Sequence, residues 1–479
     1  MRSENLWLFF SKIIQIISGL ALIRLITSML NITEVGTYYL FLSIYMFFSM
    51  SLLNPYGQYM TRNLYVWKSD NTLLSEVKVY MKVIVGVSIL GCLLLLLLSK
   101  FGLLNLDLLK IVFCGAYLIL ITVNQFLLHS LNSLGYSKKF SQATIFSSIL
   151  CILLPAGFIF NDYFRFDKVE SILLGVLVAN LFSMILCYFF LINFEKDNSK
   201  ERKSKDIKSI IIYCIPIGIY TSLLWVINSG YRIGVEDLLG LAAVAILAVS
   251  FAVSTQLMSV VESLTTQVFQ PKILQKMDID DKKIKDKYLS KYVNETIAIY
   301  FCFSIFFSLC IKYAFLVMVS SKYVDYFYLG IIAVWSEFFR VSCNALSIVY
   351  FSENYLKKFV LPYLFSASFM IFIFLILREN IFQGVNIVNF CAMLILFANL
   401  ICFMFAWFLK KNIAKIDFDY KFMVKRFLFV CPAFLVLLFI FNVSNLNVSN
   451  FILISAVSSF YLILFLLSLK KVNFRGILE

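Results

Sequence analysis

The stretch "LLLLLL", residues 93–98, decides between the two architectures that can cross a bilayer. A strand of a transmembrane barrel alternates polar and apolar side chains, because one face meets lipid and the other meets the lumen. Consecutive leucines would be apolar on both faces of a strand, so this stretch favours a helix. It ends a longer apolar run, Val83–Leu98, which predicts a membrane-spanning helix.

Similar runs recur along the whole chain, which has 479 residues, 61% of them hydrophobic and 14% charged. This composition is too apolar for a water-soluble globular protein. About fourteen runs approach the length of a helical crossing, and we therefore expect an all-α polytopic membrane protein with about 14 transmembrane helices. The runs are Leu6–Leu30, Tyr38–Leu53, Val83–Leu98, Leu108–Leu128, Phe140–Phe160, Ser171–Leu191, Ile210–Ile227, Leu239–Leu264, Thr296–Val319, Tyr326–Tyr350, Val360–Leu377, Ile387–Leu409, Phe427–Phe441 and Phe451–Leu469.

The distribution of basic residues predicts how these spans are oriented. Most of the 42 Lys and Arg residues fall in segments that are cytoplasmic if the amino terminus is inside. An even number of spans with both termini in the cytoplasm fits this bias. The net charge of +15 is therefore a signal of topology, and we expect no nucleic-acid binding, because the charge is scattered over many loops.

Metal, cofactor and enzymatic chemistry find little support in the sequence. None of the 11 Cys residues forms a CxxC pair, and all of them lie in apolar runs, where they are expected to be small buried side chains. The predicted outside loops are too short to hold a catalytic domain. We expect no metal, no cofactor and no enzymatic activity.

Two similar stretches, "GYSKKF" at 135–140 and "NYLKKF" at 354–359, predict an internal duplication. Each lies between the fourth and fifth spans of its own half, and a polar, Lys-rich linker separates the halves. Two six-helix lobes would then be related by a pseudo-two-fold axis along the membrane normal. The alternative is that Tyr, Phe and paired Lys are ordinary interface anchors. The predicted domains are an N-terminal lobe at 1–192, a linker at 193–209, a C-terminal lobe at 210–409 and two additional helices at 410–479.

Polar residues inside the spans form stripes at helical spacing. The eighth span carries Thr255, Ser259, Glu262 and Thr266, the tenth Glu337, Arg340, Asn344 and Ser347, and the seventh Thr221, Trp225, Asn228 and Arg232. Hydroxyl groups in such stripes often serve only to bond one helix to another. A full charge in a span favours a protein interior or a wet cavity, which makes Arg24, Lys312, Glu262 and the Glu337/Arg340 pair functional candidates.

Several motifs resemble the polysaccharide transporter family, and most closely its Wzx-type O-antigen flippases. These motifs are "RLITSMLNITEVGTYYLF" at 24–41, "YRIGVEDLLGLAAVAILAVSFAV" at 231–253, "QPKI" at 270–273 and "SSKYVDYF" at 320–327. The same superfamily contains drug and toxin extruders and the lipid II flippase. The chain departs from the family pattern at Tyr231, where an acidic residue often precedes the Arg, and in having fourteen predicted spans where many relatives have twelve.

The resemblance implies a flippase of the bacterial cytoplasmic (inner) membrane. Its substrate would be an undecaprenyl-pyrophosphate-linked O-antigen or related polysaccharide repeat unit, moved from the cytoplasmic to the periplasmic leaflet by alternating access and coupled to H+ or Na+. The implied partners are this lipid-linked oligosaccharide, membrane lipids, a polysaccharide polymerase and a chain-length regulator. The predicted substrate-binding residues are Arg24, Arg232, Lys312, Arg340, Asn344 and Trp225, and the predicted coupling-ion residues are Glu262 and Glu337.

Three alternatives stay open at the level of sequence. A lipid II-type flippase is compatible with fourteen spans. A cation-coupled drug extruder would need a cavity that favours cations, which the excess of Lys and Arg over Glu within the spans argues against. A membrane-bound O-antigen polymerase or ligase tends to need a sizeable outside loop, and the predicted outside loops are short.

Overall fold

The computed structural model describes residues 2–101, 107–160, 166–194, 207–274, 282–352, 355–378, 387–410 and 424, and within these residues all regular structure is helical. Twelve helical segments of the described part are long and apolar enough to cross a membrane, and each contains one of the first twelve predicted runs or most of it. The chain is therefore a multi-pass membrane protein. The runs predicted at 427–441 and 451–469 lie outside the described residues, so the total of about 14 spans stays a prediction.

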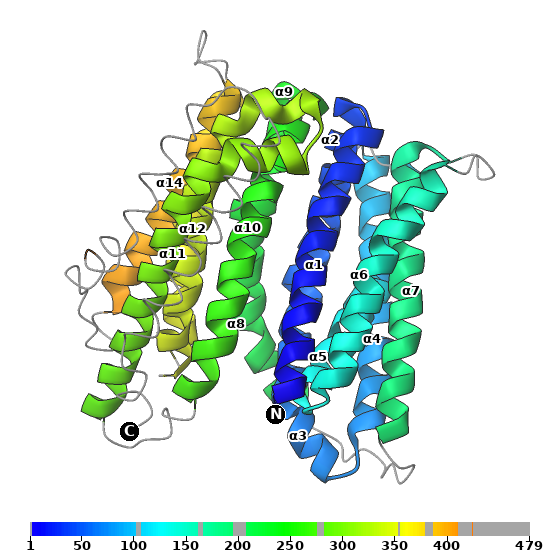
Figure 1. Cartoon of the computed structure of the whole chain (residues 1–479), viewed down its shortest axis with the longest axis vertical. Coiled ribbons are helices and arrows are strands. Elements are labelled where there is room, and N and C mark those ends of the chain that lie inside the picture. Colours follow the sequence, from blue (N-terminus) through cyan, green and yellow to red (C-terminus); the bar gives the residue numbers. More distant parts are fainter. Residues whose placement is uncertain are drawn as a thin grey trace. The chain divides into compact units, whose positions relative to one another are not determined.

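The helices follow one another with short connections (Figure 1). In chain order they are α1 (Arg2–Met29), α2 (Ile32–Phe48), η1 (Ser49–Leu53), α3 (Asn54–Ser69), α4 (Leu73–Lys100), α5 (Leu108–Ser133), α6 (Ser137–Phe160), α7 (Lys168–Phe194), α8 (Ile207–Trp225), η2 (Val226–Gly230), α9 (Tyr231–Leu239), α10 (Leu241–Leu274), α11 (Lys282–Met318), η3 (Ser321–Tyr326), α12 (Phe327–Ser352), α13 (Leu356–Arg378) and α14 (Ile387–Lys410). The second crossing, Ile32–Ser69, is longer than the predicted Tyr38–Leu53, because the helix continues into the polar segment α3.

The chain divides into two compact units. Unit 1 comprises Met1–Val249 and Ala367–Val388, and unit 2 comprises Ser250–Ser366 and Asn389–Glu479. These boundaries differ from those of the lobes expected from the sequence. The predicted lobes at 1–192 and 210–409, with their linker, and the two-fold relation between them stay predictions.

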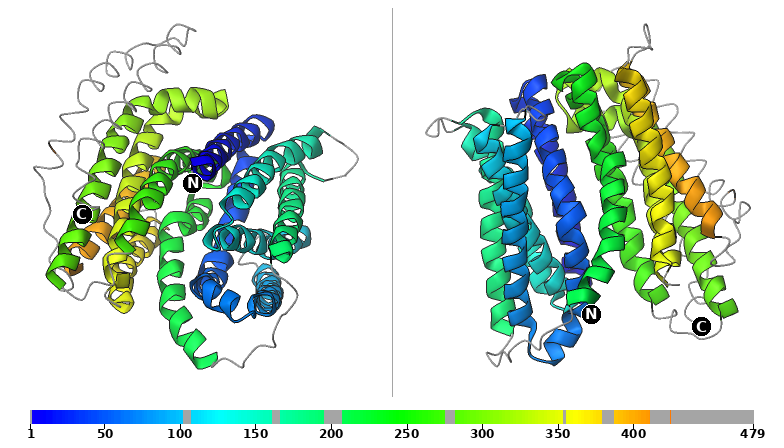
Figure 2. Two further views of the ribbon diagram at one scale, coloured as in Figure 1. Left: turned by 60° about the horizontal axis from the view of Figure 1, so that its bottom comes forward. Right: turned by 180° about the vertical axis from the view of Figure 1, so that it is seen from behind.

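Unit 1 is built on a bundle in which α5, α6 and α7 pack together, with α4 against α5 and α1 against α6 (Figure 2). Small residues allow close helix contacts, as is common in membranes. A Cβ atom added to Gly175 would lie 2.5 Å from the backbone of Pro155, so α6 and α7 touch at this point. At the start of α2, the Asn31 side chain accepts from the backbone N–H of Glu34 at 2.8 Å, and the Glu34 carboxylate accepts from that of Asn31.

Two π-helical turns, η1 and η2, interrupt helices of unit 1 and are held by side chains of neighbouring helices. Thr221 Oγ1 on α8 donates to the carbonyl of Met50 in η1 at 2.7 Å. Ser43 Oγ on α2 donates to the carbonyl of Ser229 in η2 at 3.0 Å. A backbone group freed from helical pairing must find another partner inside a membrane, and these hydroxyl groups provide it. π-turns of this kind are frequent at functional sites.

Unit 2 contains Ser250–Leu274 of α10, together with α11, η3, α12, the start of α13 and α14. Ser254 Oγ on α10 donates to the carbonyl of Gly330 on α12 at 3.0 Å. Asn399 Nδ2 on α14 donates to Ser336 Oγ on α12, also at 3.0 Å. Helix α12 is thus bonded to α10 and to α14, which fixes the face that it presents to α10.

A backbone hydrogen bond of the same sequence separation occurs at each of the two stretches that predicted a duplication. The N–H of Tyr136 donates to the carbonyl of Leu131 before α6, and that of Tyr355 donates to Tyr350 before α13, each at 2.9 Å. Each donor directly precedes the first residue of a helix, Ser137 of α6 or Leu356 of α13. This local likeness is consistent with repeated halves and with ordinary turn chemistry alike.

Candidate functional site

The polar stripes of the eighth and tenth spans meet in unit 2. Thr255 and Glu262 lie on α10, and Glu337, Arg340 and Asn344 lie on α12. Residues separated by three, four or seven positions share one helix face, so each helix contributes its polar residues as a group. We call these residues, Thr255, Glu262, Glu337, Arg340 and Asn344, the charge network.

Arg340 lies at the centre of the charge network. Its Nε donates to Glu337 Oε2 at 2.8 Å, and its Nη2 donates to Glu262 Oε2 at 3.1 Å. The first of these ion pairs joins neighbours on one helix and was expected from the spacing. The second joins α12 to α10 and could not be read from the sequence.

Both carboxylates have a further neutral donor. Thr255 Oγ1 donates to Glu337 Oε1, and Asn344 Nδ2 donates to Glu262 Oε1, each at 2.9 Å. All four carboxylate oxygens of the network are therefore hydrogen-bonded. Partners of this kind hold the acids in position and reduce the energetic cost of their burial.

The charges in the network do not balance. With both acids ionised, two carboxylates face one guanidinium, which leaves one negative charge in excess. The Glu337 side chain is 6% exposed and the Glu262 side chain 24% exposed. Glu262 is thus the more accessible of the two acids, and it is the one that a proton or a small cation could reach most readily.

Arg232 in unit 1 differs from Arg340, because its guanidinium is bonded to neutral groups and not to carboxylates. It is buried on α9, where its Nη1 donates to Ser43 Oγ at 3.1 Å and to the carbonyl of Tyr39 at 3.4 Å. The guanidinium also lies 5.3 Å from the ring centre of Tyr39 and 5.5 Å from that of Tyr231. Its Nε has no hydrogen-bond partner, and no carboxylate among the described residues pairs with it. All the groups that contact the Arg232 guanidinium within the described part of the chain are therefore neutral.

The remaining predicted residues are placed separately. Arg24 is exposed on α1, and no described acid pairs with it. Lys312 is half-buried on α11, with its Nζ 5.8 Å from the ring centre of Phe327. Trp225 donates from Nε1 to the carbonyl of Ser43 at 2.8 Å and packs on Phe47, so its indole is part of the helix contact. The structure does not join these three residues in one cluster within the described part of either unit.

Some polar residues near the candidates were not predicted. Ser43 contacts both Arg232 and η2, yet in the sequence it is only one of three serines in the apolar run 38–53 and carries no periodic signal. Asn124 and Asn180 are buried in unit 1, where Asn124 Nδ2 donates to Asn180 Oδ1 at 2.9 Å. Each is an amide in the middle of a span, which is a usable signal for helix pairing. Among the described residues, no group of His, Cys, Asp and Glu could hold a metal ion.

Comparison with known proteins identifies the fold. No protein-family model matches the sequence, and no curated protein matches it either. A lipid II flippase, MurJ, in its inward closed conformation has a TM-score of 0.62 at 16% identity over 100% of both chains. An inward-facing multidrug resistance MATE family transporter of the MOP superfamily has a TM-score of 0.56 at 12% identity, covering 84% of this chain and 95% of that one.

A third solved structure is a multidrug resistance MATE family transporter of the MOP superfamily in its outward-facing conformation, with a TM-score of 0.52 at 14% identity. The match covers 85% of this chain and 94% of that one. Identities this low establish a common fold and leave the substrate open. The chain has the fold of the MATE and MurJ transporters of the MOP superfamily.

Proposed function

We propose that the chain is a flippase for undecaprenyl-pyrophosphate-linked O-antigen or related polysaccharide repeat units. It would move them from the cytoplasmic to the periplasmic leaflet of the bacterial inner membrane, with both termini in the cytoplasm. Two kinds of support exist. The fold is shared with a lipid II flippase and with multidrug transporters, and the motifs quoted above resemble polysaccharide transporters.

The observation that carries the proposal is the burial of Arg232 without a described acidic partner. A buried guanidinium in a membrane span is costly unless an anion compensates it, and the described residues supply none. A pyrophosphate offers several anionic oxygens, and Arg binds such groups with paired hydrogen bonds. The unbonded Nε and the rings of Tyr39 and Tyr231 leave Arg232 suited to hold an anionic head while the lipid tail stays in hydrocarbon.

The charge network supplies the second half of the proposal. Its spare negative charge is suited to bind H+ or Na+, with Glu262 as the primary acceptor and Glu337 held as its partner through Arg340. Coupling of this kind needs a site whose occupancy changes the stability of one conformation relative to another. Alternating access would follow from movement of the predicted lobes against each other. Arg24, Lys312 and Asn344 remain in the set of proposed substrate-binding residues.

A deletion strain tests the proposed function directly. Cells that lack the protein should accumulate the lipid-linked repeat unit on the cytoplasmic leaflet, where an impermeant sugar-modifying reagent added to spheroplasts cannot reach it. Expression of the wild-type chain should restore access and surface polysaccharide. Drug sensitivity without such accumulation would instead assign the chain to drug export.

A lipid II-type flippase is the second candidate, since the likeness to MurJ extends over the whole of both chains. The two flippases differ in the sugar attached to the same kind of lipid carrier. Growth of cells depleted of their own lipid II flippase, restored by this chain, would favour the second candidate. Failure to restore growth, together with restored surface polysaccharide in the deletion strain, would favour the first.

A further inference from the structure

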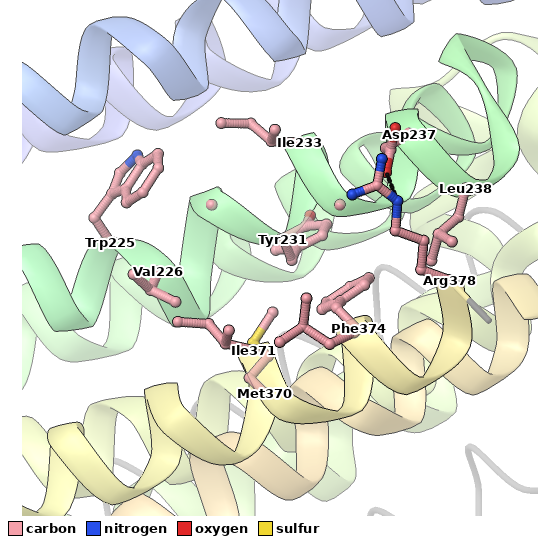
Figure 3. A pocket seen from close by; sticks show the side chains of 13 residues that line it. Trp225, Val226, Tyr231, Ile233, Asp237, Leu238, Met370, Ile371, Phe374 and Arg378 are labelled. Atoms are coloured by element: carbon pink, nitrogen blue, oxygen red, sulfur yellow. Dashed lines mark ion pairs between the residues drawn. The ribbon is translucent and has the colours of Figure 1, made fainter. Parts of the chain in front are cut away.

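A cavity of about 330 Å³ lies in unit 1 between the segment α8–η2–α9 and the C-terminal half of α13 (Figure 3). Trp225 lies at one end of it, and Asp237 and Arg378 lie at the other. Between the ends, all lining residues are apolar, aromatic or glycine, and they include Val226, Tyr231, Ile371 and Phe374. Neither the charge network nor the predicted substrate residues apart from Trp225 belong to it.

The cavity has the size and the lining of a site for a hydrocarbon chain. A cavity of about 150 Å³ holds benzene, so this one has room for roughly a dozen carbon atoms. Ile371 and Leu375 on its α13 side are 48% and 59% exposed, which in a membrane-spanning helix means contact with lipid. An elongated apolar slot along two helices suits one acyl chain better than a sugar.

The polar end of the cavity is an ion pair at the ends of two helices. Arg378 is the last residue of α13, and Asp237 lies in the last turn of α9, so both are placed near a membrane interface. Arg378 Nε lies 3.4 Å from Asp237 Oδ2, and the two side chains are 70% and 54% exposed. Such an exposed, long ion pair is weak, and most of its donors and acceptors are accessible to a ligand.

The geometry points to a binding site for one zwitterionic phospholipid with a primary ammonium, of the phosphatidylethanolamine type. One acyl chain occupies the cavity, the phosphate binds Arg378, and the ammonium binds Asp237. The paired opposite charges make the end of the cavity neutral, which matches a zwitterionic head better than an anionic one. A guanidinium binds phosphate with two parallel donors, and an ammonium has three donors for a carboxylate.

The bound lipid would brace the helix that carries Arg232. Tyr231 lines the cavity and Arg232 is its neighbour in α9, on the side that faces α2. A lipid held between α9 and α13 therefore stabilises the position of the buried guanidinium from the opposite side. The site does not depend on which substrate is transported.

Native mass spectrometry of the purified full-length protein in detergent tests the site. The protein is incubated with phosphatidylethanolamine, phosphatidylglycerol or phosphatidylcholine of the same acyl chains, and the retained lipid is counted. The wild type should retain phosphatidylethanolamine most strongly. Ile371→Trp fills the cavity and should reduce retention by more than about tenfold, because the buried contact area of the chain is lost. Phe372→Trp, a change at an exposed residue of α13 outside the lining, is the matched control and should retain the lipid.

Two variants of the ion pair test how the head is recognised. Asp237→Asn should lower retention of phosphatidylethanolamine by about two- to fivefold and remove its advantage over phosphatidylglycerol. Arg378→Gln should lower retention of all three lipids. Equal retention of the three lipids by the wild type, or full retention by Ile371→Trp, would overturn the proposal. Thermal unfolding of each variant reports on folding, and a rise in the unfolding temperature on adding phosphatidylethanolamine, seen in the wild type and absent in Ile371→Trp, supports the site independently.

Discussion

Arg232 is buried in a membrane-spanning segment, Arg340 lies in another with 16% of its side chain exposed, and their surroundings are opposite. Arg340 contacts two carboxylates in unit 2, whereas Arg232 in unit 1 contacts a serine hydroxyl, a backbone carbonyl and two aromatic rings. One site therefore has a negative charge to spare and the other a positive charge. The comparison shows that an arginine in a membrane span has no fixed role. The number of carboxylates in contact with the guanidinium decides whether the site suits a cation or an anion.

The largest expected effect comes from removing the cation of the charge network. Arg340→Met leaves the buried Glu337 and the partly exposed Glu262 without their shared partner, which should cost about 3 kcal/mol of stability. Thermal unfolding of the purified protein in detergent measures this loss. A triple variant that also carries Glu262→Gln and Glu337→Gln has no net charge at the site and should regain most of the stability. A single variant as stable as the wild type would contradict an excess of negative charge in the network.

Arg232→Ala should affect transport far more than stability. The change leaves only neutral groups behind, so the protein should reach the membrane in normal amount. Loss of the charge-assisted hydrogen bonds to an anionic head should weaken substrate binding by about 1.5–3 kcal/mol. Transport should then fall by roughly 10- to 100-fold. Surface polysaccharide and the amount of protein in the membrane are measured together, with Lys78→Ala, an exposed cation of α4, as the control. Wild-type transport in Arg232→Ala would remove Arg232 from the substrate site.

Glu262→Gln should separate transport from its driving ion. The amide keeps an oxygen that can accept from Asn344 but loses the negative charge opposite Arg340. Transport into vesicles should fall by about tenfold, because one charge-assisted hydrogen bond is lost. The remaining transport should no longer respond to an imposed H+ or Na+ gradient. Glu337→Gln is the comparison, because Glu337 is the less accessible acid. An unchanged response to both gradients in Glu262→Gln would exclude this residue as the coupling site.

The smallest expected effect concerns a neutral neighbour of Arg232. Ser43→Ala removes the hydroxyl that accepts from Arg232 and donates to Ser229. Arg232 keeps its charge and its bond to the carbonyl of Tyr39, so the loss should be only about 1 kcal/mol, and transport should fall by roughly fivefold with little change in protein amount. Ser28→Ala, at an exposed position of α1, is the control. An effect as large as that of Arg232→Ala would show that Ser43 itself contacts the substrate.

The spans and the local charge pairs were predictable from the sequence, because both depend on spacing along one helix. The runs of apolar residues gave the twelve membrane-competent segments of the described part, and the separation of Glu337 from Arg340 gave their ion pair. The contact of Glu262 with Arg340 depends instead on how α10 packs on α12, and no pattern within one helix encodes it.

Two further features lie beyond sequence patterns for other reasons. The lack of a described acidic partner for Arg232 depends on how the chain packs around it. Two acids, Glu236 and Asp237, lie close to Arg232 in the sequence but do not pair with it. Trp225 was predicted to bind substrate, which stays a prediction, and the bond from its indole N–H to the backbone of α2 could not be read from the sequence. A π-turn such as η2 has no characteristic amino-acid composition. The sequence therefore does not predict which residues of α9 face α2, and the structure is needed to show it.

The π-turn Val226–Gly230 makes the length of this segment as important as its composition. A π-turn behaves like a single extra residue accommodated within an α-helix. If the same residues were wound as a regular α-helix, with the extra residue no longer taken up at η2, α9 would be rotated by about 100° about its axis. Arg232 would leave Tyr39 and Ser43, and Asp237 would leave Arg378, without any change in these residues themselves. Two related chains could therefore share every side chain of the site and still differ in what they bind, through the presence or absence of this π-turn.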